Sequence, residues 1–286
     1  MQSLRLPAKL FSPKISIFTY MISAIRSRFS AFRYAGALAV CALLVTASCR
    51  YKEKVLVVTP EPSTPLYGSL TVKFSNEAGG TPIVMGSGTY TNAAGNAYKV
   101  DLLKYFVSNF TLIKSDNSEH NFANYKLINA ADTSTCSFTL DSVANGTYKA
   151  VRFYIGVDSA KNHTLLNEGD LNASNGMTWT WSTGYIFFKH EGTFINDTGG
   201  TSVLLYHYGV DANMKTIDIP VSAFTIAADH KTMLLKFDLN KQYGDPNVIT
   251  FDSGNAVHQS LETRDRAWLG QMKANFSSAF TFDKVQ

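Results

Sequence analysis

Apolar and polar residues alternate along many short stretches of this chain. Leu70, Val72 and Phe74 are separated by polar residues, which is the period-2 pattern of a strand with one buried face. Stretches that alternate in this way, or that are rich in aromatic and β-branched residues, are 70–75, 105–114, 125–129, 137–141, 147–158, 185–194, 203–208, 216–221 and 232–239. Clusters of Gly, Asn, Asp and Pro separate them. The pattern predicts an all-β fold, an antiparallel β-sandwich in a single domain, with a short C-terminal helix at about 262–275.

The N-terminal segment has a different pattern. Residues 1–33 contain six basic residues and no acidic one, and an apolar run from Tyr34 to Val45 follows. The run is shorter than the roughly 20 residues of a membrane-spanning helix, and it ends in Thr46-Ala47-Ser48-Cys49. These features predict a bacterial lipoprotein signal with a lipidated Cys49. An uncleaved anchor, with Cys49 as an ordinary thiol, is the alternative interpretation.

The signal divides the chain into three expected parts. Residues 1–48 are the expected signal peptide, and 49–67 are the lipidated cysteine and a tether with three prolines between Thr59 and Pro65. Residues 68–286 are the expected β domain. We therefore expect a membrane-anchored protein of the cell envelope, either periplasmic or exposed at the surface.

Removing the signal changes the charge and the cysteine count. The remaining 20 basic and 22 acidic residues give a net charge of −2 in place of +4, so the alkaline pI does not indicate nucleic-acid binding. Cys136 is then the one cysteine that is neither removed nor acylated, so an intrachain disulfide is excluded. Cys136 lies in a predicted strand and is expected to be a small buried apolar residue.

A stripe of large side chains lies between Gly176 and Tyr185. Trp179 and Trp181 would project from the same face of a strand, and Met177 would join them. Three interpretations of the stripe are open at this point. It could be core packing in a sandwich, a platform on which a sugar stacks, or an oxidisable site near a metal.

Several ordered motifs surround these tryptophans. They are Phe-x-Ile-Gly-Val-Asp-Ser-x-x-Asn at 153–162, Gly-Met-x-Trp-x-Trp-x-x-Gly-Tyr at 176–185, Lys-x-Glu-Gly at 189–192 and Tyr-His-x-Gly at 206–209. Together they resemble the MbnP family, which is named for the methanobactin copper-acquisition operon, over about 70–282. The resemblance implies a β-rich periplasmic or surface protein that associates with copper. It also implies a partner, a dihaem cytochrome c peroxidase-like enzyme that oxidises a motif tryptophan to kynurenine. That residue is Trp179 or Trp181, with Trp179 slightly preferred.

Copper binding requires ligands of suitable chemistry. Imidazole suits both common oxidation states of copper, and thioether suits Cu(I). His207 matches the family's Tyr-His-x-Gly motif and is the first choice, His163 and His190 flank the tryptophans, and Met177 is a soft candidate. His258 has no close partner along the sequence. No His-x-His or His-x₃-His spacing occurs, so the fold must assemble any site, and each histidine could instead be a surface or hydrogen-bonded core residue.

The sequence lacks the motifs of several enzyme classes. Gly-x-Ser-x-Gly, a Gly-rich phosphate loop, His-Glu-x-x-His and Cys-x-x-Cys-His are all absent. We therefore expect the chain to be the protein substrate of the dihaem partner and not itself an enzyme. The alternative hypothesis is a surface glycan-binding lipoprotein that uses Trp179 and Trp181 as a stacking platform, and it requires both rings to be exposed.

Overall fold

The structure is a computed structural model that describes residues 66–286, apart from 165, 180–182, 253 and 255. The predicted signal peptide, the lipidation site Cys49 and the tether up to residue 65 lie outside the described residues. They therefore stay predictions. In the part of the chain that is described, no helix is long and apolar enough to cross a membrane.

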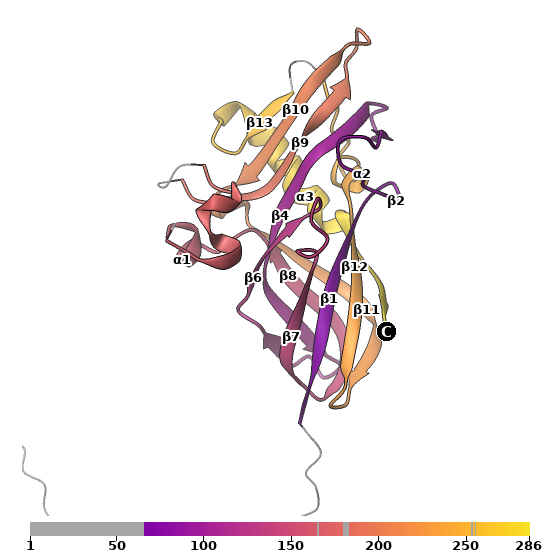
Figure 1. Ribbon diagram of the computed structural model, residues 1–286, viewed down its shortest axis with the longest axis vertical. Coiled ribbons are helices and arrows are strands. Elements are labelled where there is room, and N and C mark those ends of the chain that lie inside the picture. Colours follow the sequence, from indigo (N-terminus) through magenta and orange to yellow (C-terminus); the bar gives the residue numbers. More distant parts are fainter. Residues whose placement is uncertain (1–65, 165, 180–182, 253, 255) are drawn as a thin grey trace, which may run out of the picture. The chain divides into compact units, whose positions relative to one another are not determined.

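One of the two sheets has five strands. They are β1 (Tyr67–Ala78), β2 (Thr81–Pro82), β7 (Ser137–Ala144), β12 (His230–Asp238) and β14 (Phe280–Val285). Strand β1 is central, because it pairs in parallel with β12 and antiparallel with β7. The last strand of the chain, β14, pairs antiparallel with the other side of β12. The sheet thus joins segments from both ends of the described chain (Figure 1).

The other sheet has nine strands. They are β3 (Tyr90–Thr91), β4 (Ala97–Lys114), β5 (Glu119–Asn121), β6 (Tyr125–Asn129), β8 (Gly146–Ile155), β9 (Ile186–Ile195), β10 (Thr201–Gly209), β11 (Lys215–Ile226) and β13 (Val257–Gln259). The long strand β4 pairs with β9 along its first half and with β8 along its second half. Strand β10 continues the sheet beyond β9 and pairs in parallel with β13 at the edge. The sheet therefore has a β9–β10 end and a β8–β11 end (Figure 1).

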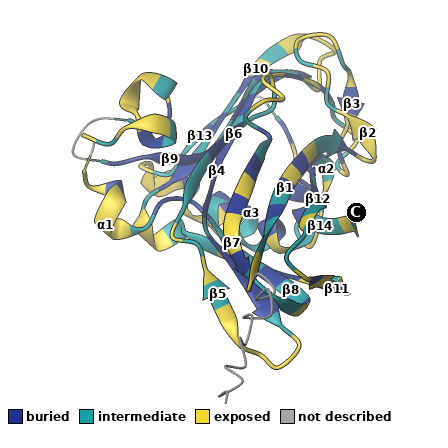
Figure 2. Ribbon diagram, turned by 60° about the horizontal axis from the view of Figure 1, so that its bottom comes forward, coloured by how far each residue is buried: buried dark blue, intermediate teal, exposed yellow. Residues whose placement is uncertain are grey.

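Helices are few and mostly short. They are α1 (Ser159–Asn162), α2 (Leu239–Gln242), α3 (Arg266–Ala279) and the 3₁₀ turns η2 (Gly169–Leu171), η3 (Ala173–Asn175), η4 (Asp211–Asn213) and η5 (Thr263–Asp265). Only α3 is long, and it buries Trp268, Met272 and Phe276. Helix α1 is mostly exposed, as its yellow ribbon in Figure 2 shows.

Aromatic side chains fill the space between the two sheets. Phe74 of β1 lies edge-on to Tyr105 of β4 and to Phe153 of β8, with ring centroids 6.3 and 5.8 Å apart. Phe188 of β9 packs edge-on against Phe237 of β12 at 6.0 Å. Burying such a side chain contributes roughly 1.5–3 kcal/mol, so these inner faces dominate the stability of the sandwich.

The predicted fold class is confirmed, because the described chain is mostly β and consists of two sheets packed together. Each of the nine predicted stretches falls largely within an observed strand. The sheets are mixed, however, since β1–β12 and β10–β13 are parallel. Alternation shows which side of a strand is buried but not the direction of its neighbour. The C-terminal helix begins at Arg266, about four residues later than expected, after the η5 turn.

Candidate functional site

The segment with the tryptophan motif lies at the β9–β10 end of the nine-stranded sheet. A single bridge joins Thr178 to Tyr185. Beside it, the Trp179 amide donates to the Gly184 carbonyl at 3.2 Å, and the Ile186 amide donates to the Met177 carbonyl at 2.8 Å. Residues 177–179 and 183–185 therefore lie side by side and antiparallel, and these two segments are here called the Trp hairpin. Trp181 lies outside the described residues.

Trp179 packs directly on Gly209, the last residue of β10. A Cβ atom added to Gly209 would lie 2.5 Å from Cη2 of the Trp179 ring, which is closer than real Cβ contacts. Glycine is therefore needed here for close approach. The Trp179 side chain is partly buried, and its Nε1 is buried with no hydrogen-bond partner among the described residues.

His207 lies two residues before Gly209 on the same strand. Side chains two apart on a strand point to the same face, about 7 Å apart along it. Lys189 is directly opposite His207 in the β9–β10 register, so it shares this face. The face points away from the five-stranded sheet, because the neighbouring Phe188 packs against Phe237 of that sheet. We call it the outer face. Trp179 covers this face at Gly209, where β10 ends, two residues beyond His207.

Glu191 holds the imidazole of His207 in place. Its Oε1 lies 2.9 Å from His207 Nε2 and 3.2 Å from Lys189 Nζ. Burial opposes ionisation of Glu191, but hydrogen bonds from His207 and Lys189 outweigh it, so its pKa is lowered. An ionised carboxylate only accepts hydrogen bonds, so His207 Nε2 carries the proton and Nδ1 has a lone pair.

The protonation of His207 follows from its surroundings. Burial is the largest influence and lowers the pKa of His207. The hydrogen bond to Glu191 raises that pKa, while the positive charge of Lys189 lowers it. The net shift is downward, so the neutral imidazole is favoured.

His190 lies on the opposite face of the sheet. It pairs in register with Tyr206, points into the core and is fully buried. Its Nδ1 lies 2.6 Å from Tyr243 Oη, and its Nε2 has no partner among the described residues. Burial lowers the pKa of His190 to about 3. Because His190 and His207 point to opposite faces of the sheet, they do not share a site in this structure.

The other two predicted ligands have different surroundings from those of His207. His163 is exposed, and its Nε2 lies 2.9 Å from Asp211 Oδ2. Met177 is 1% exposed and belongs to the core. In the described ranges, no group of three or more His, Cys, Asp or Glu side chains is placed to hold a metal ion. Among the described residues, the three candidate histidines therefore do not form such a group.

The other motif residues hold the Trp hairpin. Asn162 is fully buried, and its Oδ1 accepts from the Tyr185 amide at 2.7 Å while its Nδ2 donates to Asp211. Gly184 has a positive φ of 85°, and a Cβ there would collide with Asn162. A Cβ at Gly156 would likewise collide with the ring of Phe187. Residues far apart in sequence thus fix the hairpin that carries Trp179.

His258 on β13 is also held by a carboxylate, which its place in the sequence did not indicate. Its Nδ1 lies 2.7 Å from Oδ1 of the buried Asp265, and its ring stacks on Trp268 at 4.7 Å. Asp265 also accepts from the Gln259 amide at 2.7 Å. The spacing of seven residues gave no indication of the pair, because a turn and η5 separate the two positions.

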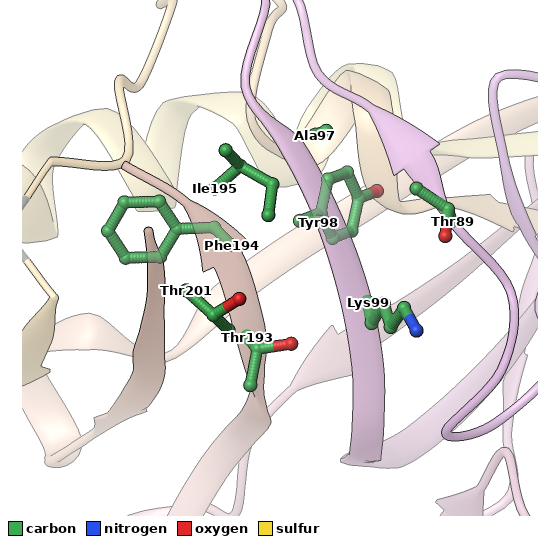
Figure 3. Close-up of a pocket in the computed structure, with 8 residues that line it drawn as sticks. All are labelled: Thr89, Ala97, Tyr98, Lys99, Thr193, Phe194, Ile195 and Thr201. Carbon is green, nitrogen blue, oxygen red and sulfur yellow. The ribbon is translucent and has the colours of Figure 1, made fainter. Parts of the chain in front are cut away.

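A small pocket elsewhere on the nine-stranded sheet does not involve these residues. It has a volume of about 200 Å³ and lies where β4 and β9 run side by side (Figure 3). Its walls are Thr89, Ala97, Tyr98, Lys99, Thr193, Phe194, Ile195 and Thr201. None of the predicted site residues lines it, so the candidate site remains the outer face beside Trp179.

Comparisons with known proteins agree with the motifs. The family model described as MbnP matches residues 67–259. The solved structure of MbnP from Methylosinus trichosporium is similar, with a TM-score of 0.51 and 16% sequence identity. The match covers 76% of this chain and 97% of that one, and at this identity it supports the fold alone. The comparison with curated proteins gives no match.

Proposed function

The chain belongs to the MbnP family, and on this basis we propose that it is a lipid-anchored envelope protein whose Trp179 is oxidised to kynurenine and which then binds copper. The oxidising enzyme is a dihaem cytochrome c peroxidase-like partner, and this chain is its substrate. The observation that carries the proposal is the contact between Trp179 and Gly209, two residues from His207.

The oxidation requires an external oxidant, which the partner enzyme uses. Two equivalents of hydrogen peroxide remove four electrons from the indole and open its five-membered ring to N-formylkynurenine, with release of water. Hydrolysis then releases formate and leaves an aniline nitrogen and a ketone. Trp179 suits this reaction for two reasons. The residue is partly exposed, and its Nε1 makes no hydrogen bond to the described residues that the reaction would have to break.

The donor groups around Trp179 are compatible with copper once the ring is opened. Metal-ligating imidazoles commonly donate their other N–H to a carboxylate, as His207 does to Glu191. His207 Nδ1 and the nitrogen or oxygen of the oxidised side chain would hold the ion. His163, His190 and Met177 would have to leave their present hydrogen bonds or packing to join them.

Intact mass tests the modification. The protein is expressed with and without the dihaem enzyme, as the wild type and as the Trp179→Phe and Trp181→Phe variants. We expect the wild type and Trp181→Phe to gain about 4 Da with the enzyme present, and Trp179→Phe to gain nothing. A gain in Trp179→Phe that is lost in Trp181→Phe would assign the reaction to Trp181. An unchanged wild type would reject the modification.

Copper titration tests the metal. Oxidised protein is compared with unoxidised protein, with His207→Ala and with a control, His230→Ala, whose exposed imidazole contacts Ser69 at 2.8 Å. We expect tight binding only by oxidised wild type and the control. Equal binding by His207→Ala would remove His207 from the site.

Palmitate labelling of the wild type and Cys49→Ala, in the bacterial host, tests the anchor.

The glycan-binding alternative receives no support from Trp179. A stacking platform needs the flat face of each ring to be open to a sugar. Trp179 is only partly exposed and lies on the backbone of Gly209. Its environment therefore favours the oxidation hypothesis.

A further inference from the structure

Three basic side chains form a row across the outer face. Lys104 of β4 lies directly opposite Lys189 of β9, and Lys189 lies directly opposite His207 of β10. Like charges that are directly opposite on neighbouring strands are destabilising. The two lysines therefore require compensating acceptors nearby, and these acceptors indicate what the lysines do.

The acceptors of the two lysines are consecutive carbonyl groups immediately before the Trp hairpin. Lys104 Nζ donates to the Asn175 carbonyl at 3.0 Å, and Lys189 Nζ donates to the Gly176 carbonyl at 3.3 Å. These carbonyls end the η3 turn, where Gly176 has a positive φ of 70°. The last carbonyls of a helical turn have no partner inside it, so donors from outside the turn, here the two ammonium groups, satisfy them.

Lys189 in addition connects the Trp hairpin to His207. Gly176 is three residues before Trp179, and Met177 between them is buried in the core. Lys189 also lies 3.2 Å from Glu191, which holds His207. A continuous set of polar contacts thus runs from the hairpin backbone through Lys189 and Glu191 to the imidazole.

We propose that Lys104 and Lys189 are positioning residues that fix the Trp hairpin on the sheet, and so place Trp179 beside His207. The placement itself stands on these contacts, while its effect on oxidation rests on the proposed function. Lys126 differs, because its ammonium lies 3.9 Å from Asp170 in an exposed ion pair. Such a pair contributes little to stability.

Fluorine NMR of protein labelled with fluorotryptophan tests the placement. The chain has three tryptophans, and Trp→Phe variants assign their resonances. In the double variant Lys104→Met/Lys189→Met, we expect the Trp179 resonance to shift or broaden. The resonance of Trp268, which is buried in the core, should stay unchanged. The matched control is Lys99→Met, an exposed lysine on the same strand, and Lys189→Arg should retain the wild-type spectrum because it keeps the donor.

Oxidation by the dihaem enzyme gives the second measurement. We expect the rate of mass gain to fall on the order of tenfold or more in the double variant, because small misplacements of a reacting group are costly. An unchanged Trp179 resonance in the double variant overturns the inference. If the double variant unfolds, which also shifts Trp268, the Lys189→Met variant is judged by the same criterion. A wild type that is not oxidised rejects the proposed function and leaves the resonance test intact.

Discussion

His207 donates from Nε2 to Oε1 of Glu191 over 2.9 Å, diagonally across the β9–β10 pair. This contact fixes both the tautomer and the orientation of the imidazole, and it leaves Nδ1 as the nitrogen with a lone pair.

Glu191→Gln should alter His207 without changing the fold. The carboxylate raises the pKa of His207, so its removal should lower that pKa further below the ordinary value. Copper affinity of the oxidised protein should fall by roughly 10–100-fold, as is typical when a partner of a ligating imidazole is lost. NMR titration of His207 and copper titration measure the two effects, and an unchanged His207 pKa would contradict the assigned contact.

Gly209→Ala should displace Trp179. The new Cβ would lie 2.5 Å from the ring and 2.6 Å from the Tyr185 carbonyl oxygen, so side chain or backbone must move. Overpacking of this kind costs about 1–3 kcal/mol. Denaturant unfolding should show this loss, together with slower oxidation of Trp179.

The matched control for that variant is Gly270→Ala. Gly270 lies inside α3, and a Cβ there would meet nothing within 4 Å. Alanine should stabilise the helix by up to about 1 kcal/mol. If both variants were equally stable, Gly209 would not be the close contact that the structure indicates.

His190 should make the protein sensitive to acid. Its pKa in the folded chain is about 3, below the ordinary value of 6.5, so the unfolded chain binds the proton more tightly. The free energy of unfolding should therefore fall as the pH drops below about 6.5, by up to about 1.4 kcal/mol per pH unit from this residue. Urea unfolding at several pH values measures the slope. His190→Gln should show a shallower slope, and an identical slope would refute the role of His190.

Asn162→Ala should loosen the Trp hairpin. The change leaves the Tyr185 amide without its buried acceptor, which costs about 1–3 kcal/mol. Hydrogen exchange of the Tyr185 amide should become faster. The exposed Asn121 on β5 provides a control, since Asn121→Ala removes contacts that water can replace. Equal exchange rates in the two variants would count against the anchoring role of Asn162.

The strands could be predicted because their information is local. Leu70, Val72 and Phe74 are buried as their alternation predicts, since side chains two apart on a strand share one face. The ordered motifs between 153 and 209 likewise indicated the family, because they can be recognised from residue types and spacing alone. The parallel pairing of β1 with β12 could not be predicted, because backbone pairing over a separation of about 160 residues leaves no periodic pattern in either strand.

The sequence by itself determined the two-sheet β class, the buried faces of the strands and the candidates Trp179 and His207. Only the tertiary structure decided that His190 faces the core while His207 faces outward with Glu191. It also decided that the ring of Trp179 packs on the backbone of Gly209. The contact in which Lys104 donates to the Asn175 carbonyl, just before the Trp hairpin, is likewise visible only in the tertiary structure. The physical reason is that strand register sets which side chains face each other, and register depends on packing across the whole sandwich.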